Sequence, residues 1–302
     1  VVVDCGNGVA GPWVTTLLPR LGCDVIPLYC DIDGTFPNHH PDPEKAENLQ
    51  DLIAAVQQHQ ADIGLAFDGD GDRLGVVSNS GTIINADQLL CLFATDLLSR
   101  HPGAEIVHDV KCSLALRRLI EQAGGVATMW KSGHAMIKNR MRDSRALFGG
   151  EFSGHLFFAD QWYGFDDGLY SAVRLLELML QRNQSADQLF SAYPKTCATP
   201  MYHLAVPEAE KFALVAQLQA LSFPGATVYD IDGLRVEYPD GWAGIRASNT
   251  TPMLTLRFEA DNPAALRRIQ HQFEKILQQI NPDLQIPELA VTNDTNSISR
   301  DP

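Results

Sequence analysis

An acidic, glycine-rich stretch between two apolar runs constrains this chain more than any other part of its sequence. The stretch reads DGDGDR at residues 68–73, and the apolar runs cover 63–67 and 74–77. Short, continuous apolar runs bounded by turn residues are typical of buried strands. We therefore predict a tight loop between two strands of one sheet, and we call residues 68–73 the acidic loop.

The acidic loop has the composition of a divalent-metal site. The carboxylates of Asp68, Asp70 and Asp72 repel one another unless a cation lies between them. Gly69 and Gly71 allow positive φ and close backbone approach, so the acidic side chains can converge on one point. Hard oxygen ligands favour Mg²⁺ or a similar ion, which also binds phosphates. The alternative is an ordinary acidic surface turn.

The composition indicates a soluble globular protein of two or three domains. The chain has 302 residues, of which 45% are hydrophobic and 20% are charged. It contains neither an apolar run of membrane-spanning length nor a signal-peptide pattern. A formal net charge of -14 argues against nucleic acid and anionic membranes as partners. A phosphate site would therefore need a local cluster of Arg and Lys.

The cysteines and the start of the chain suggest its context. The six cysteines form no CxxC pair and have no metal-ligand spacing. We therefore predict buried free thiols in a reducing cytoplasm rather than a disulfide framework. Because Val1 already lies in a strand pattern, we expect the chain to be the later part of a longer protein.

The order of apolar segments predicts an α/β fold. A strand, a glycine turn, a helix and a strand open the chain, and the same order recurs after residue 83. We predict two related α/β (βαβ mixed-sheet) domains, followed by a small α+β C-terminal domain that ends in the helix 263–280. The predicted domains are 1–82, 83–194 and 195–289, and we predict a disordered tail at 290–302.

The first glycine turn offers a competing function. Gly6, Gly8 and Gly11 match the GxGxxG pattern, and Asp31 stands where a ribose-binding acid would lie. An NAD-dependent oxidoreductase is therefore one alternative. In the simpler alternative, the glycines only let a helix turn back closely on the sheet.

Two further groups of polar residues follow predicted strands. Lys111 and His134 stand at strand ends, where side chains of α/β units commonly face a ligand. The basic residues at 138–142 are predicted to form a solvated helix face. Glu151, Ser153 and His155 alternate, so in an extended loop all three side chains face the same way and can contact the hydroxyls of a polyol. A polar hairpin rim is the alternative for this group.

A fourth group is suited to phosphate. Arg246, Ser248, Asn249 and Thr250 precede the apolar strand at 253–258. An arginine fork, hydroxyls, an amide and backbone N–H groups together make a phosphate cradle. We therefore predict an anion-binding loop here.

Taken together, these groups resemble the α-D-phosphohexomutase superfamily, and most closely its bacterial phosphomannomutase/phosphoglucomutase members. The matching runs are DGDGDR at 68–73, KSGH at 131–134, GEFSGH at 150–155, WYGFDDGLYSA at 162–172 and RASNTTP at 246–252. The resemblance extends to about residue 289. It implies a protein of four domains around a cleft, of which this chain resembles the last three.

The resemblance also implies an activity and a set of roles. The family interconverts hexose 1-phosphates and 6-phosphates through a phosphoserine enzyme and a bisphosphorylated sugar, glucose 1,6-bisphosphate or mannose 1,6-bisphosphate. By this resemblance Mg²⁺ would be held by Asp68, Asp70 and Asp72, with Arg73 beside the phosphoryl group and Lys111 and His134 in the cleft. Glu151, Ser153 and His155 would contact the sugar, and Arg246, Ser248, Asn249 and Thr250 would hold the other phosphate.

One family feature is missing from the sequence. The family carries its phosphoserine in a T-A-S-H-N-P-type loop, and no such run occurs in these residues. We therefore expect the chain to lack the N-terminal phosphoserine domain and to be inactive by itself. A non-catalytic module that binds sugar phosphates is the alternative consistent with this.

Overall fold

The computed structural model describes residues 1–194, 196–248 and 251–287. These residues divide into two compact units. Unit 1 holds Val1–Cys112, Leu116–Met129 and Gly133–Tyr193, and unit 2 holds the chain from Pro194 with the short segments Ser113–Ala115 and Trp130–Ser132.

The first sheet of unit 1 begins with the strand, helix, strand order expected from the sequence. Its strand order is β2-β1-β3-β4-β5. β1, β2 and β3 are parallel, and β4 pairs antiparallel with both β3 and β5. The strands are β1 (Val2–Asp4), β2 (Ile26–Leu28), β3 (Ile63–Phe67), β4 (Leu74–Ser78) and β5 (Ile83–Ile84). The helices are α1 (Gly11–Arg20), the 3-10 helix η1 (Ala46–Leu49) and α2 (Gln50–His59).

Helices cover both faces of this sheet. Side chains of a strand alternate between the two faces, so consecutive residues of β1 enter different hydrophobic clusters. Val2 lies in one cluster with Leu52 of α2, whereas Val3 lies in another with Val14 and Leu18 of α1. β3 is buried along its whole length, as its continuous apolar run predicted.

The second sheet of unit 1 has the strand order β7-β6-β8-β9, with β6 and β8 parallel and β9 antiparallel to β8. Phe93, Phe148 and Phe158 pack their rings together in its core. Its strands are β6 (Glu105–Asp109), β7 (Val126–Trp130), β8 (Phe148–Gly150) and β9 (Leu156–Phe158). Its helices are α3 (Ala86–Arg100), α4 (Leu114–Gln122), α5 (His134–Ser144), α6 (Gly168–Arg182) and α7 (Ala186–Ser191).

Unit 2 is the predicted small α+β domain. Its sheet has the order β10-β15-β14-β13-β12, and β11 also pairs with β15. Asn262 caps α9 by accepting a hydrogen bond from the Ala265 N–H, and Pro263 occupies the first turn. The elements are β10 (Cys197–Ala198), β11 (Tyr202–Ala205), α8 (Lys211–Gln219), β12 (Thr227–Tyr229), β13 (Leu234–Tyr238), β14 (Gly241–Ala247), β15 (Met253–Ala260) and α9 (Pro263–Ile280).

The predicted fold class is confirmed, with some elements missed. The sequence analysis did not identify β14, and it placed Arg246 in a loop, whereas Arg246 lies on that strand. Gly241 and Gly244 weaken the strand pattern there, but Gly241 is needed because a Cβ at this position would lie 2.5 Å from the Glu259 carbonyl oxygen. The boundaries at 82 and 194 stay predictions, and the tail at 290–302 lies outside the described residues.

Two other predictions concern the cysteines and membranes. None of the six cysteines forms a disulfide, as predicted, but only Cys5, Cys91 and Cys112 are buried. Within the described part of the chain, no helix combines the length and apolar character needed to cross a membrane.

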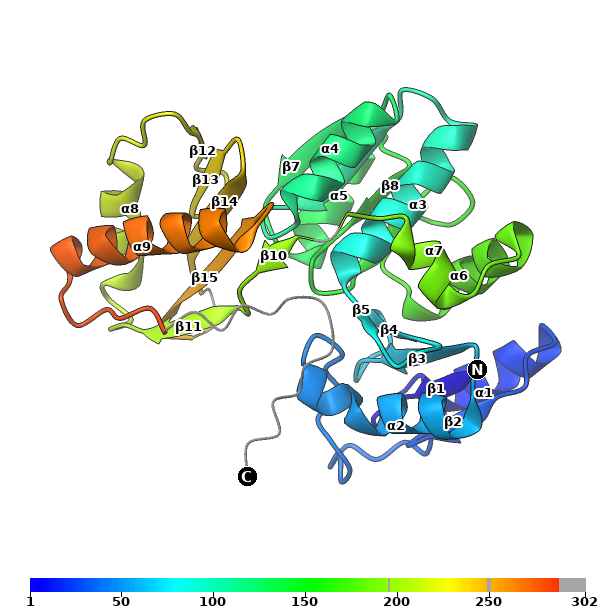
Figure 1. The fold of residues 1–302 in the computed structure, drawn as a ribbon. Helices are drawn as coiled ribbons and strands as arrows, with labels where there is room; N and C mark the ends of the chain where they lie inside the picture. The colour runs from blue at the N-terminus through cyan, green and yellow to red at the C-terminus, as the bar shows by residue number, and fades with distance from the viewer. Residues whose placement is uncertain (195, 249–250, 288–302) are drawn as a thin grey trace. The chain divides into compact units, whose positions relative to one another are not determined.

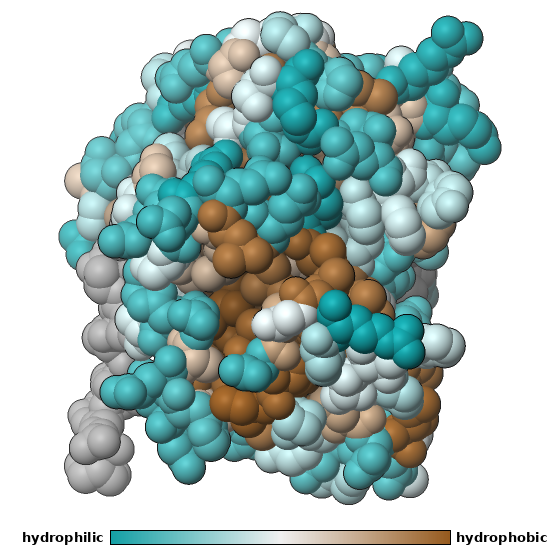
Figure 2. Space-filling view, turned by 90° about the vertical axis from the view of Figure 1, so that its right-hand side faces the viewer, coloured by the Kyte–Doolittle hydropathy of each residue, from teal (hydrophilic) through white to brown (hydrophobic). Residues whose placement is uncertain are grey.

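Unit 1 also has an apolar area on its surface. Figure 2 shows hydrophobic residues gathered near the middle of the face that lies on the α1 and α6 side of Figure 1, surrounded by hydrophilic residues. Large apolar side chains are exposed at the ends of these helices, at Leu21 and Leu180. The surface of unit 1 is therefore not uniformly polar. A contiguous apolar patch is a feature of interest on a protein surface, whereas scattered single apolar residues are ordinary.

The glycines of the GxGxxG run are explained by close packing. A Cβ at Gly11 would lie 1.9 Å from the carbonyl oxygen of Cys30, and one at Gly8 would lie 2.8 Å from the carbonyl oxygen of Gly69. The first contact brings α1 close to the chain that follows β2. The second seats the glycine turn directly against the acidic loop.

We predict that Gly11→Ala strongly destabilises the protein. The added methyl has no room beside Cys30, and overpacking of this kind costs about 1–3 kcal/mol. Thermal unfolding followed by circular dichroism should show a clearly lower midpoint. Gly34→Ala is the matched control, because a Cβ at Gly34 meets nothing within 4 Å. Equal midpoints for the two variants would contradict the packing explanation.

Candidate active site

The acidic loop lies between β3 and β4, as predicted, and brings its carboxylates together. Asp68 is buried, Asp72 is half-buried and Asp70 is exposed. One oxygen of each lies within 4.8 Å of the others. Three clustered carboxylates, one of them open to solvent, suit a hard divalent cation with room for further ligands. The donor set therefore fits Mg²⁺.

Arg73 neutralises the buried end of this loop. Its backbone N–H donates to Asp68 Oδ1 at 3.0 Å, and its Nε donates to Asp68 Oδ2 at 2.6 Å. Its NH1 group donates to Asp42 Oδ1 at 3.1 Å. Burial raises the pKa of Asp68, and the hydrogen bonds and charge of Arg73 offset only part of that rise. Both oxygens of Asp68 are thus held in place by one residue.

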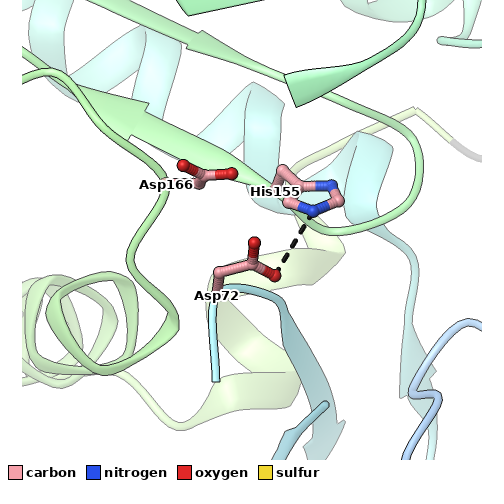
Figure 3. Close-up of side chains that lie close together, drawn as sticks. All are labelled: Asp72, His155 and Asp166. Atoms are coloured by element: carbon pink, nitrogen blue, oxygen red, sulfur yellow. Dashed lines mark ion pairs between the residues drawn. The ribbon is translucent and has the colours of Figure 1, made fainter. Parts of the chain in front are cut away.

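The predicted sugar-binding group lies directly beside the acidic loop. His155 Nε2 is 3.3 Å from Asp72 Oδ1 (Figure 3), and the two loops also pair through the Leu74 N–H, which donates to the Gly154 carbonyl at 3.2 Å. His155 Nδ1 lies 2.9 Å from Ser153 Oγ and 3.4 Å from Glu151 Oε2. His155 therefore connects the acidic loop to both other members of its group.

The side chains of Glu151, Ser153 and His155 converge, but not in the way that the sequence analysis predicted. We expected an extended loop in which alternation aligns the side chains. Residues 151–155 instead form a tight turn, closed by the Glu151 N–H donating to the His155 carbonyl at 2.9 Å, with Gly154 at a φ of +97°. The turn brings Glu151, Ser153 and His155 together through local hydrogen bonds, which a period-two pattern does not describe.

Charge complementarity ties these groups together. Burial alone lowers the pKa of His155, but its contact with Asp72 and the negative charge of Glu151 raise that pKa above its usual value. Burial raises the pKa of Asp72, but the attraction of His155 brings it below its usual value. Burial, and next the charge of Asp109, raise the pKa of Glu151. The cluster thus keeps His155 protonated more readily than a free histidine.

Asp166 completes this cluster and was not singled out by the sequence analysis. Figure 3 shows it close to Asp72 and His155, and one ligand atom of each lies within 4.8 Å of the others. Asp166 Oδ2 is 3.1 Å from His134 Nδ1, and Asp166 Oδ1 accepts from Lys138 Nζ at 2.7 Å. It falls within the run at 162–172, which gave the only signal for it.

The prediction about the basic residues of α5 is only partly right. We predicted that residues 138–142 form a solvated face, which is right for the exposed Arg142 and wrong for Lys138 and Arg140. Lys138 pairs with Asp166, and Arg140 pairs with Glu105 at 2.6 Å. Lys138 follows His134 by four residues on α5, so both side chains project from the same helix face.

Lys111 and His134 both lie near this group. Lys111 Nζ lies 3.5 Å from Asp109 Oδ2, and its positive charge lowers the pKa of Glu151, which larger effects raise overall. The ring of His134 stacks on that of His155 with centroids 5.8 Å apart. Glu151 Oε1 accepts from the Gly133 N–H at 2.6 Å, which places the carboxylate at the start of α5.

The predicted phosphate cradle lies in unit 2. Arg246 NH2 is 3.1 Å from Asp232 Oδ2, and Arg246 Nε is buried with no hydrogen-bond partner among the described residues. Ser248 Oγ accepts from the Thr251 N–H at 3.1 Å. Asn249 and Thr250 lie outside the described residues. The arginine is therefore held by Asp232 through its NH2 group.

Comparison with known proteins places this geometry in a family. Family models match residues 1–81 (phosphoglucomutase/phosphomannomutase, alpha/beta/alpha domain II), 85–197 (alpha/beta/alpha domain III) and 201–276 (C-terminal domain). The chain therefore belongs to the phosphoglucomutase/phosphomannomutase family, as the motifs indicated.

Individual relatives support the same family assignment. The chain is 56% identical to the phosphomannomutase/phosphoglucomutase of Pseudomonas putida, over 95% of this chain and 62% of that protein. It is 50% identical to the phosphoglucomutase of Neisseria meningitidis, over 94% and 62% respectively. A crystal structure of a family protein from Burkholderia thailandensis, 51% identical, matches with a TM-score of 0.88 over 95% of this chain and 61% of that one. The chain thus spans about 62% of the length of these curated relatives.

We predict that Asp70→Asn weakens Mg²⁺ binding without unfolding the protein. The exposed Asp70 carboxylate makes up part of the donor set but is not buried, unlike Asp68. Isothermal titration with MgCl₂ should show an affinity at least about tenfold lower, because ligand charge sets the affinity of such sites. Asp62→Asn, an exposed carboxylate at the opposite end of β3, is the control. Unchanged affinity in Asp70→Asn would remove this residue from the metal site.

Proposed function

We propose that this chain supplies the metal, sugar and distal-phosphate sites of a phosphohexomutase that interconverts the 1- and 6-phosphates of mannose, glucose or both. The observation that carries the proposal is the contact between the acidic loop and the 151–155 turn through Asp72 and His155. In a chain of this family, this contact joins a cation site to a polyol-binding group. The reaction would use glucose 1,6-bisphosphate or mannose 1,6-bisphosphate as its intermediate.

The chemistry suits the residues of unit 1. Phosphoryl transfer depends on positioning and on cancelling negative charge rather than on covalent chemistry. Asp68, Asp70 and Asp72 would hold Mg²⁺, which supplies positive charge beside the phosphoryl group. Arg73 would add a second positive charge from the same loop.

The neighbouring groups would handle the sugar and its protons. Glu151 accepts hydrogen bonds, and Ser153 both donates and accepts, so the pair can hold sugar hydroxyls. His155, whose ring contacts both Asp72 and Ser153, would hold these two groups in place beside the sugar. Lys111 and His134 would line the site as charge-stabilising or acid–base groups.

Unit 2 would hold the phosphate that does not react. Arg246 lies near the end of β14, where Asp232 holds its NH2 group, and Ser248 follows that strand directly. Asn249 and Thr250 stay predicted members of this clamp. Binding energy from a remote phosphate orients the reacting end of the substrate, which lowers the barrier only if the clamp holds in the transition state.

The covalent phosphoryl carrier is not among these residues. Because no T-A-S-H-N-P-type run occurs in the sequence, we propose that the phosphoserine belongs to a part of the enzyme outside these 302 residues. We also propose that the enzyme works in the cytoplasm, since none of the six cysteines forms a disulfide. A sugar-phosphate-binding module without turnover is the second candidate. The NAD alternative loses its support, because Gly8 and Gly11 are required for packing.

A titration separates these candidates. We expect the chain to bind glucose 1,6-bisphosphate in the presence of Mg²⁺ and not to bind NAD, as measured by calorimetry. The complete enzyme should interconvert mannose 1- and 6-phosphates, whereas the 302-residue chain alone should not. NAD binding without sugar-phosphate binding would contradict both the mutase proposal and the binding-module proposal.

For the distal clamp, we predict that Arg246→Ala in the complete enzyme raises KM far more than it lowers kcat. A lost charge-assisted hydrogen bond is worth about 1.5–3 kcal/mol, which corresponds to a KM roughly 10- to 150-fold higher. Arg268→Ala on α9, whose arginine pairs with Asp240 at the surface, is the control. A KM equal to that of the unmodified enzyme would show that Arg246 does not hold the phosphate.

A further inference from the structure

The proline-rich segment at residues 36–43, which we call the 36–43 loop, has no role in the function described so far. Its residues are Phe36, Pro37, Asn38, His39, His40, Pro41, Asp42 and Pro43. The structure shows that this loop is fixed at several points around the acidic loop.

Its prolines fill spaces that glycines leave open. A Cβ at Gly6 would lie 2.8 Å from Pro41 Cβ, and a Cβ at Gly75 would lie 2.6 Å from Pro43 Cβ. Gly6 follows β1, which pairs with β3, and Gly75 lies on β4. The 36–43 loop therefore packs against the sheet that carries the acidic loop. The rings of Pro41 and Pro43 also restrict the backbone on both sides of Asp42.

Buried polar contacts hold the preceding residues. His39 Nε2 lies 3.0 Å from Asp4 Oδ2, and Asp4 is only 1% exposed. Asn38 Nδ2 donates to Asn7 Oδ1 at 2.8 Å. A charged group buried at the end of β1 is costly unless it is paired, so the His39 contact is a strong anchor for the loop.

The loop aims one carboxylate at Arg73. The Asp42 N–H donates to the His40 carbonyl at 2.8 Å, and the Asp42 carbonyl accepts from Asn48 Nδ2 at 2.9 Å. With its backbone held on both sides, Asp42 places Oδ1 at 3.1 Å from NH1 of Arg73. The side chain of Asp42 is 18% exposed, so this pair is largely shielded from solvent.

Asp42 differs from the other carboxylate on Arg73. Asp68 belongs to the candidate metal cluster, so it would share its charge between Arg73 and the cation. Asp42 is not in that cluster and contacts Arg73 independently of it. Among the contacts of the described residues, Nε and NH1 of Arg73 each face a carboxylate, whereas NH2 has no carboxylate partner.

We propose that Asp42 is a positioning residue for Arg73. It fixes the guanidinium plane so that the NH2 edge faces the reacting phosphoryl group, and the 36–43 loop exists to hold Asp42 there. The part that concerns the phosphoryl group rests on the proposed function. The part that concerns the orientation of Arg73 does not.

The orientation can be tested on the 302-residue chain without activity. NMR of the arginine side chains measures rotation of the Arg73 guanidinium about its Nε–Cζ bond, which slows when its edges are held. We expect rotation at least threefold faster in Asp42→Asn than in the unmodified chain. Asp33→Asn is the control, because the Asp33 carboxylate accepts from the N–H and hydroxyl of Thr35 rather than from an arginine. Equal rotation rates in Asp42→Asn and the unmodified chain would overturn the proposal.

Kinetics of the complete enzyme test the consequence. Misplacing a charged catalytic group by a small distance costs about 10- to 100-fold in rate. We expect Asp42→Asn to lower kcat by at least about tenfold with KM changed less than threefold, and Asp42→Glu to recover part of kcat. In an Arg73→Lys background, Asp42→Asn should have little further effect, because its target is gone.

The outcomes are distinct. If Asp42→Asn lowers kcat as much in the Arg73→Lys background as alone, Asp42 acts by another route and the proposal fails. If Asp42→Asn lowers only the unfolding midpoint and leaves kcat unchanged, Asp42 is structural and the proposal also fails. If the unmodified complete enzyme lacks mutase activity, the proposed function fails, and the NMR measurement still decides whether Asp42 positions Arg73.

Discussion

The pairing of Asp68 with Arg73 is the interaction that holds the acidic loop in shape. A carboxylate that is 2% exposed would be very costly without a cationic partner, and Arg73 supplies both a backbone and a side-chain donor to it. Because the two residues belong to the same loop, the pair also closes that loop. Asp70 is then left exposed and Asp72 half-buried beside His155, where a divalent ion can share their charge.

Close backbone packing surrounds this pair. The carbonyl of Gly71 accepts from the N–H of Gly168 at 3.1 Å, and a Cβ at Gly168 would lie 2.7 Å from the same carbonyl oxygen. Gly8 approaches the loop from another segment, at the carbonyl of Gly69. Glycines far apart in the sequence therefore serve one purpose, because only a residue without a side chain lets these backbones meet. This accounts for a glycine pattern that a nucleotide-binding motif explains less well.

The sequence predicted local features well and distant partners poorly. The apolar runs on either side of the acidic loop identified β3 and β4, because a buried strand needs a continuous apolar run. The carboxylates within one loop could likewise be grouped by spacing alone. Asp42 and Asp166 could not be assigned, since they reach Arg73 and Lys138 across 31 and 28 residues of chain. Such contacts depend on how elements pack, and no periodicity within one segment encodes them.

Both arginines proposed to bind phosphate are held by carboxylates on tight segments. Asp42 and Asp68 hold Arg73 in unit 1, and Asp232 holds Arg246 in unit 2. Asp232 precedes Gly233, whose φ of +81° and lack of a Cβ let the turn pack against Arg246. A free arginine loses much side-chain entropy when it binds an anion, whereas a held one has already lost it during folding. Each carboxylate leaves part of the guanidinium available, so the fold itself prepares the arginine for its ligand.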